Sequence, residues 1–464
     1  MNILAQRNSE DSYFKSAWLL FLAAVLTFIL AFVFGMLGSY KFVVLTALIP
    51  LLLLLLINFH MVYFLLILGI FLNFAYLNFS HAVVYSALLP VSFLINYRNI
   101  KKDDFYVPVA VPLFIYFFTV LLSIINSAKP LYSLYLSYNF VALIIIVFIT
   151  TAFIKNRSQV NKYVGIYLGL VALNSIHVIV ESVFLHKRSF GYAGIMYVDY
   201  VGIGIVILVA LIIINNRYNA AKVILLALFL LGSLLTQTRN AWIVTMLTVV
   251  WLWFYCYNKS DILKIDKKKL VRLLLVILVL IPVILVIAKV VNPGNFERVD
   301  VGQTEVAFSN EGLAQNSFVT RLLIWHTALN AFLSHPIIGI GAYSFSFSSH
   351  LYYTIPEFLY KMYVEGLSPH VGYLEVLTEN GIIGLIAFFV FIVAVIRHVF
   401  RTIKKSKNTE ELSLMMIVNW PLIYISISLF MTDAWLWGKG VVLWGILIGL
   451  SMAVNRLNKV SPLE

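Results

Sequence analysis

Arg239, Arg321 and His370 are the residues whose types and positions most favour chemistry, because each lies beside an apolar segment. Charged side chains close to a membrane are costly and often mark a functional site. Arg239 lies between two apolar runs, within the sequence TQTRNAW. The plain alternative is that Arg239 is a snorkelling side chain or a topology determinant.

Arginine and histidine supply complementary chemical groups. A guanidinium binds phosphate oxygens in a bidentate manner and keeps its charge, whereas an imidazole can exchange a proton near neutral pH. Taken alone, Arg321 could be a surface charge of a helix, and His370 could be a structural residue. If the three residues lie together, they predict anion binding by Arg239 and Arg321, with His370 as a base or as a residue that positions the acceptor.

The elements that must position these residues are apolar and long. The chain has 464 residues, of which 62% are hydrophobic and 11% charged, whereas soluble proteins carry about 25% charged residues. Apolar runs of about 20 residues match the hydrocarbon thickness of a membrane as helices. The predicted spans are 17–37, 40–58, 61–78, 81–96, 107–126, 131–154, 162–184, 193–214, 220–237, 240–257, 270–291, 382–400, 412–432 and 438–454.

These spans predict an all-α integral membrane protein with about 12–14 transmembrane helices and one long helical extracytoplasmic loop. The expected parts are an N-terminal bundle of about 11 helices (1–291), the loop with short helices (292–381) and about three C-terminal helices (382–464). Within the loop, helical spacing is expected over 321–333 and 371–379, the second ending at Asn380-Gly381. The first span is expected to be retained and not to be a signal peptide.

The distribution of basic residues predicts the orientation. If the N-terminus is inside, the inner segments hold 23 of the 33 Lys and Arg residues, as the positive-inside rule requires. We therefore expect cytoplasmic N- and C-termini in the inner (plasma) membrane and an active site on the outer face. The net charge of +13 then needs no nucleic-acid partner.

Metal and disulfide chemistry are not expected. Cys256 is the single cysteine, so an intrachain disulfide cannot form. No D-x-D motif or cluster of His and carboxylate residues indicates a metal site, although Glu375 and Glu379 are candidates for one. No cofactor is predicted.

The motifs around the three basic residues resemble those of the O-antigen ligase and Wzy-type polysaccharide polymerase superfamily, most specifically over about 235–385. An Arg at the outer end of a helix is followed by RLLIW from Arg321, by PIIGIGAYSF with Gly339 and Gly341, and by HVGYLEVLTENGIIG from His370. The sequence departs from the family at Val371, where Asn is common, and at Asn240, where Gly often follows the Arg.

The resemblance also implies substrate-binding residues. The segment from Arg188 to Gly191 and the later Asp199 are weaker matches to an R-x-x-G motif and a helix-end Asn of the family. With Gly339, Gly341 and Tyr373, Arg188 and Asp199 form the predicted substrate-binding set.

By resemblance, the protein is expected to be a membrane glycan transferase of cell-envelope polysaccharide biosynthesis, of O-antigen, capsule or exopolysaccharide type. It would move a glycan from undecaprenyl diphosphate to an acceptor hydroxyl in a metal-independent, inverting reaction. The acceptor would be a lipid or a glycan, and a flippase or chain-length regulator could be an accessory partner. The resemblance leaves ligase and polymerase equally open.

Three alternatives stay open at this point. A transporter or flippase of polysaccharide intermediates would also have many helices, although no repeated halves are evident. A structural partner of a synthase complex is the second alternative. The third is catalysis by a carboxylate, with Asp199 or Glu181 near an outer helix end as the base.

Overall fold

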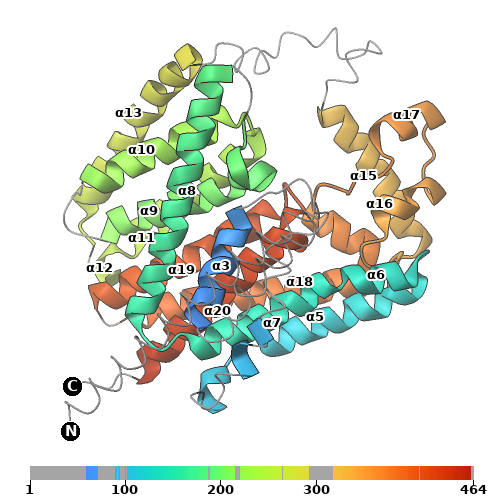
Figure 1. Cartoon of the computed structure of the whole chain (residues 1–464), viewed down its shortest axis with the longest axis horizontal. Helices are drawn as coiled ribbons and strands as arrows, with labels where there is room; N and C mark the ends of the chain where they lie inside the picture. The colour runs from blue at the N-terminus through green and yellow to red at the C-terminus, as the bar shows by residue number, and fades with distance from the viewer. Residues whose placement is uncertain are drawn as a thin grey trace, which may run out of the picture. The chain divides into compact units, whose positions relative to one another are not determined.

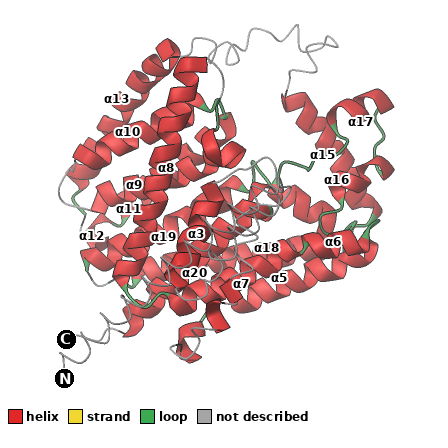
Figure 2. Ribbon diagram, in the orientation of Figure 1, coloured by secondary structure: helices red, strands yellow, loops and turns green. Residues whose placement is uncertain are grey.

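The computed structural model describes residues 59–71, 89–90, 92–94, 100, 102–185, 189–214, 220–263, 265–291, 317–406 and 408–460. Every regular element in these ranges is a helix (Figures 1 and 2). The chain forms two compact units, of which the first comprises 1–66 and 84–100 and the second 67–83 and 101–464. In the first unit, Val62, Tyr63 and Leu66 of α3 (Phe59–Phe71) are buried. The features described below belong to the second unit.

Seven helices of the described residues are long and apolar enough to cross a membrane, which confirms the predicted class of all-α integral membrane protein. The predicted spans 17–37 and 40–58 lie outside the described residues. The principal helices before residue 317 are α5 (Ala110–Ser123), α6 (Pro130–Leu136), α7 (Tyr138–Phe153), α8 (Arg157–Leu185), α9 (Tyr197–Ile214), α10 (Ala220–Leu235), α11 (Arg239–Asn258) and α13 (Lys267–Val291). Those after it are α15 (Ser317–Ser334), α16 (Phe345–Ser348), α17 (Glu357–Tyr363), α18 (Gly372–Lys404), α19 (Thr409–Ser428) and α20 (Gly438–Val460).

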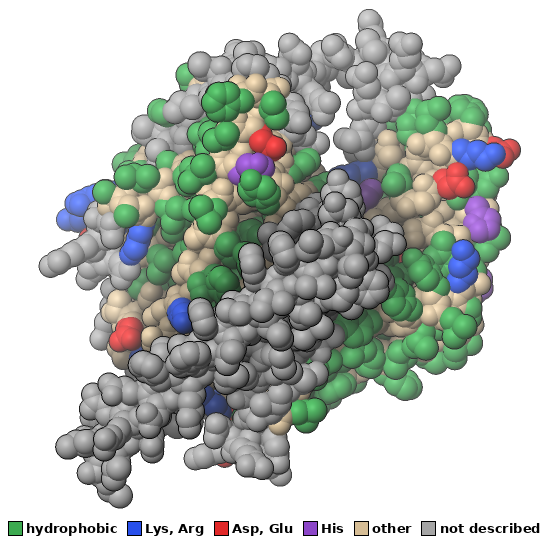
Figure 3. Space-filling view, in the orientation of Figure 1, with side chains coloured by type: hydrophobic (Ala, Val, Ile, Leu, Met, Phe, Trp, Pro, Cys, Tyr) green, Lys and Arg blue, Asp and Glu red, His purple; other side chains and the backbone are tan. Residues whose placement is uncertain are grey.

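The interior of the second unit is formed mainly by α9, α19 and α20, whose apolar windows are about nine-tenths buried. α7 packs along α20, and α9 packs along α19. Other helices expose apolar side chains, as α5 does at Val111, Phe114 and Phe118. Figure 3 shows hydrophobic side chains over the visible faces of α5 and α6, as expected for helices that face lipid.

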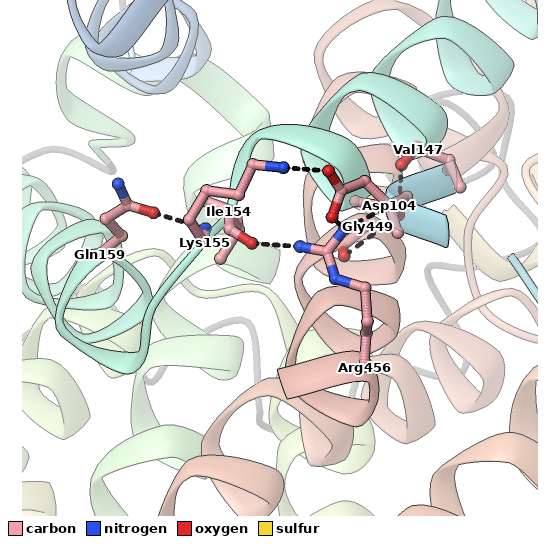
Figure 4. Close-up of polar contacts among 8 residues, drawn as sticks. Asp104, Val147, Ile154, Lys155, Gln159, Gly449 and Arg456 are labelled. Carbon is pink, nitrogen blue, oxygen red and sulfur yellow. Dashed lines mark hydrogen bonds and ion pairs between the residues drawn. The ribbon is translucent and has the colours of Figure 1, made fainter. Parts of the chain in front are cut away.

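A cluster of charged side chains, here called the polar clamp, joins one end of several helices. It comprises Asp104, Lys155, Arg157, Glu411 and Arg456. The Asp104 carboxylate forms ion pairs with Lys155 and with Arg456, the latter at 2.9 Å (Figure 4). Arg157 Nη2 donates to Glu411 Oε1 at 2.8 Å. These residues come from the segments 97–106, 155–162 and 397–411 and from the C-terminal tail, all of which are predicted from the sequence to lie on the inner side. The polar clamp brings these four segments to one end of the bundle.

The chain between α13 and α18 has an apolar core of its own from residue 324 onward. Ile324 and Ala328 of α15 pack with Phe345 of α16 and with Tyr360 and Tyr363 of α17. Figure 1 shows α15, α16 and α17 close together. Because this segment buries its own side chains, it holds a defined shape against the start of α18.

The predicted helices 371–379 and 382–400 form one helix in the structure. α18 runs through both and bends at Gly381, whose φ is +64°. The bend leaves two backbone N–H groups without helical partners, and both donate to another segment. Ile382 N donates to Pro336 O at 2.9 Å, and Ile383 N donates to Ile337 O at 3.3 Å. The Asn380-Gly381 signal therefore marks a bend within a helix and not its end.

Candidate active site

Arg321 lies at the centre of the candidate site, one turn into α15. Its two Nη atoms are each 2.7 Å from the side-chain amide of Asn240, which accepts both hydrogen bonds through its oxygen; this amide orientation is assigned from the hydrogen-bond pattern. Asn240 is the second residue of α11 and directly follows Arg239. The contact therefore brings the two predicted arginines into one neighbourhood, although they come from helices far apart in the sequence.

α15 also contacts the segment that carries His370. Trp325, one helical turn after Arg321, donates its indole N–H to Pro369 O at 3.1 Å. Residues separated by four positions lie on the same face of a helix. One face of α15 thus contacts both the start of α11 and the residue before His370.

The backbone of His370 is strained and is held by a carboxylate. Its φ of +58° is uncommon for a residue other than glycine. Its N–H donates to Asp433 Oδ2 at 3.0 Å, and its Nδ1 lies 4.0 Å from Asp433 Oδ1. The Asp433 side chain is buried, whereas 41% of the His370 side chain is exposed, so the imidazole can meet a substrate while the carboxylate stays behind it.

Asp433 also acts on Arg321. Burial lowers the pKa of the Arg321 guanidinium, and the charge of Asp433 opposes this shift. A guanidinium keeps its proton under either influence. The Asp433 carboxylate therefore interacts electrostatically with Arg321 and also accepts the hydrogen bond from the backbone of His370.

Arg239 begins α11 and has an exposed side chain. The preceding turn contains Gln237 at φ +53°. The N-terminus of a helix carries partial positive charge, so an anion beside Arg239 would also be attracted by α11. We call Arg239, Asn240, Arg321, His370 and Asp433 the arginine–histidine site.

Gly339 and Gly341 lie where the backbone of their segment passes very close to α18 and to Ser127. Gly339 has φ +75°, and a Cβ there would lie 2.3 Å from the backbone of Glu379 in α18. A Cβ on Gly341, at φ +105°, would lie 2.6 Å from Ser127. Backbone bonds complete the crossing, with Gly341 N donating to Glu379 O at 3.0 Å. This geometry explains why glycine is present at both positions, and their contact with substrate stays a prediction.

The Glu379 side chain holds the segment that follows these glycines. Its Oε2 accepts from Tyr343 N at 2.6 Å, and its Oε1 accepts from Phe345 N at 3.1 Å. Tyr343, at φ +57°, in turn donates its hydroxyl to Leu436 O at 2.9 Å. Gln237, Tyr343 and His370 are the non-glycine residues with positive φ in the described part of the chain. Such strain is characteristic of functional sites.

The other predicted substrate-binding residues are not among these contacts. Tyr373 is buried and donates to Ser426 O at 3.1 Å. Asp199 is buried in α9, where it accepts from Tyr424 and Ser428 of α19. Arg188 lies outside the described residues. Their substrate-binding roles stay predictions.

Two residues of this neighbourhood were missed at the level of sequence. Asp433 could have been found as a carboxylate in the short connection between the apolar segments 412–432 and 438–454, because a charge beside spans needs a reason. Asn240 was noticed only as a departure from a family motif. No sequence pattern relates Asn240 to Arg321.

The arrangement can bind an anionic group and remove a proton beside it. Two guanidinium groups supply positive charge, and His370 offers an imidazole that the Asp433 segment holds in place. Among the described residues, no three His, Cys, Asp or Glu side chains are placed to hold a metal ion.

Part of the chain matches a known protein family. The family model described as O-antigen ligase matches residues 224–389, a segment that contains Arg239, Arg321 and His370 but not Asp433. A search among curated proteins found no significant match. The match over residues 224–389 confirms the resemblance to the O-antigen ligase and Wzy-type polymerase superfamily that the motifs predicted.

Proposed function

We propose that the protein is a membrane glycan transferase that moves a glycan from undecaprenyl diphosphate to an acceptor hydroxyl, as a polymerase or a ligase. The observation that carries this proposal is the contact of Arg321 with Asn240, the residue that directly follows Arg239. Two guanidinium groups beside a membrane suit a lipid-linked diphosphate. The substrate belongs to cell-envelope polysaccharide synthesis.

The proposed reaction is a single displacement. The acceptor oxygen forms a bond to the anomeric carbon while the bond from that carbon to the diphosphate oxygen breaks. The electron pair leaves with the diphosphate, and the acceptor proton passes to the imidazole of His370. A single displacement inverts the configuration at the anomeric carbon, and the positive charges stabilise the departing anion without a metal ion.

The residues divide the work according to their chemistry. Arg239 and Arg321 bind the diphosphate, since the fork of a guanidinium matches phosphate oxygens. His370 is the base. Asp433 is a positioning residue, because it bonds to the backbone of His370 at 3.0 Å and does not face the donor itself in this proposal.

The proposed setting follows the charge distribution of the sequence. The protein lies in the inner (plasma) membrane with cytoplasmic termini, and the arginine–histidine site faces outward. The polar clamp supports this topology, since it brings four predicted inner segments to one end. A flippase would deliver the lipid-linked donor, and a chain-length regulator is a further proposed partner.

The test is a transfer assay with purified full-length protein, a lipid-diphosphate glycan and an acceptor. Replacing Arg239 or Arg321 with Ala should lower the rate by about 10²–10³-fold, the usual effect of losing one stabilising donor. Arg272→Ala removes an exposed arginine of α13 and should leave the rate unchanged. Wild-type rates in both site variants contradict the proposed role of the arginines, and a rate abolished by EDTA contradicts metal independence.

A further inference from the structure

A second site lies between α5 and the distal half of α18, formed by residues that the proposed transfer reaction does not use. It is a cavity of about 640 Å³, within the usual range of small-molecule sites. Its apolar part is lined by Val109 and Pro112 at the start of α5 and by side chains of α18 from Ile386 to Ala394. We call this cavity the basic groove.

The opposite part of the basic groove carries positive charge. Arg397, Arg401 and Lys405 line it at intervals of four residues, so they form one stripe along α18. The stripe covers roughly 12 Å at the rise of an α-helix. Like charges at this spacing repel each other, so the stripe is unfavourable unless an anion lies against it.

The described residues supply no such anion. None of their ion pairs involves Arg397, Arg401 or Lys405. Asp104 and Glu411 are bonded to other basic residues of the polar clamp. No described residue therefore neutralises the three cations, which can bind an anionic ligand.

The apolar part of the groove continues onto a surface suited to lipid chains. Ile386, Phe389, Val390 and Val393 line the groove and are exposed. They precede the basic stripe along the same helix. A ligand that fits both parts has an anionic head and hydrocarbon chains parallel to α18.

We propose that the basic groove binds an anionic phospholipid of the surrounding membrane, with its phosphate at Arg397 and Arg401 and its acyl chains against Ile386–Ala394. Basic pockets between transmembrane helices favour acidic lipid headgroups. Arg397 and Arg401 can each bind a phosphate in a bidentate manner. The site is separate in sequence and in residues from the arginine–histidine site, so it does not depend on the transfer reaction.

The test measures bound lipid directly. Full-length protein is placed in nanodiscs that contain equal amounts of phosphatidylglycerol and phosphatidylcholine, and the lipid retained after transfer to detergent is counted by native mass spectrometry. The wild type should retain phosphatidylglycerol in preference to phosphatidylcholine. R397Q/R401Q should lose that retention by roughly tenfold, which corresponds to about 1.4 kcal/mol of attraction.

The matched control is K268Q/K404Q, which removes two exposed lysines that do not line the groove and should retain phosphatidylglycerol as the wild type does. A second variant, A394W, keeps every charge but fills the groove, so it should also lose the lipid. Size-exclusion profiles establish that each variant is folded. Equal retention by groove and control variants overturns the proposal, as does equal retention of the two phospholipids by the wild type.

A further arm distinguishes the source of the phosphate. Undecaprenyl phosphate is added in competition with phosphatidylglycerol at equal concentration. Retention of phosphatidylglycerol supports a membrane phospholipid as occupant. Displacement of phosphatidylglycerol from the wild type, with loss of undecaprenyl phosphate in R397Q/R401Q, overturns that choice and assigns the groove to polyprenyl lipids.

Discussion

Arg321 is held by an uncharged partner, and this fixes its direction without neutralising it. Asn240 accepts from both Nη atoms at 2.7 Å. An amide at this position orients the guanidinium, whereas a carboxylate would form an ion pair with it and weaken its attraction for a diphosphate. Asn240 is therefore a positioning residue for Arg321.

The first residue-scale prediction compares two substitutions of Asn240. Asn240→Ala should lower kcat/KM by about tenfold, because a misplaced charge stabilises the departing group less well. Asn240→Asp should lower it further and should raise KM for the lipid-linked donor, because the new carboxylate competes with the diphosphate. The measurement is steady-state transfer with donor and acceptor varied separately. An unchanged KM for the donor in Asn240→Asp contradicts the positioning role.

The second residue-scale prediction concerns Asp433. Asp433→Asn keeps an oxygen that can accept the His370 N–H but removes the negative charge 4.0 Å from His370 Nδ1. That charge stabilises the imidazolium formed when the base takes its proton, so kcat should fall by at least about tenfold while the fold persists. Asp433→Ala also removes the acceptor. Leaving a buried N–H without a partner costs about 1–3 kcal/mol, so Ala should lower the thermal stability below that of Asn. Equal melting temperatures for the two variants would argue against the backbone bond.

The candidate site was predictable where residue type and motif coincide. Arg239, Arg321 and His370 were predicted because charge beside an apolar segment needs an explanation, and the family match covers all three. Asp433 and Asn240 were not predicted to act there. Their roles depend on tertiary contacts between residues 63 positions apart (His370 and Asp433) and 81 positions apart (Asn240 and Arg321), which no local pattern encodes.

At the scale of elements, the bend of α18 holds the segment 336–345, which contains Gly339 and Gly341, against this helix. The N–H groups freed at Gly381 are bonded by Pro336 O and Ile337 O, and Gly339 crosses this bend with its backbone against Glu379. The bend and the segment 336–345 therefore depend on each other. A side chain at the crossing would separate them.

The element-scale prediction compares two glycines with the same φ of +75°. A Cβ on Gly366 would meet no atom within 4 Å, whereas a Cβ on Gly339 would lie 2.3 Å from backbone. Gly366→Ala should cost only the strain of its φ, about 1–3 kcal/mol. Gly339→Ala should cost more and should reduce the yield of folded protein.

Thermal unfolding in detergent, followed by size exclusion, provides the measurement. Since the two substitutions share the same backbone strain, their difference isolates the close approach at Gly339. Similar melting temperatures for the two variants would show that the crossing can relax.

Helix positions were the most predictable feature of the elements, because runs of apolar residues determine both length and class. The span predicted at 131–154 corresponds to α6 and α7, and that predicted at 193–214 corresponds to a helical segment ending at Ile214. The bend at Gly381 was predicted as a helix end instead. An Asn-Gly pair commonly ends a helix. Here the helix continues after Gly381, because the carbonyl groups of Pro336 and Ile337 accept the N–H groups that the bend leaves without a helical partner.

At the scale of the whole molecule, the proposed topology can be tested by labelling cysteines introduced one at a time. Cys256 is the only cysteine and is buried, so an added cysteine can be labelled alone. Glu357 of α17 and Lys404 of α18 are both exposed. In intact cells, a membrane-impermeant thiol reagent should label Glu357→Cys but should label Lys404→Cys only after the membrane is permeabilised.

The wild type is the control for labelling at Cys256 in this experiment. Labelling of Lys404→Cys but not Glu357→Cys in intact cells would invert the topology and place the arginine–histidine site on the cytoplasmic face. Labelling of both in intact cells would show that the two residues lie on the same side. Either outcome contradicts the orientation inferred from the basic residues.

The dispersal of the arginine–histidine site along the chain also bears on its biogenesis. Arg239 and Arg321 leave the ribosome well before Asp433, which lies between α19 and α20. A nascent chain that has inserted everything through α18 still lacks the carboxylate that holds His370. The proposed site is therefore completed only when the last hairpin of helices enters the membrane. We expect truncated translation products to be inactive even though they contain all three basic residues.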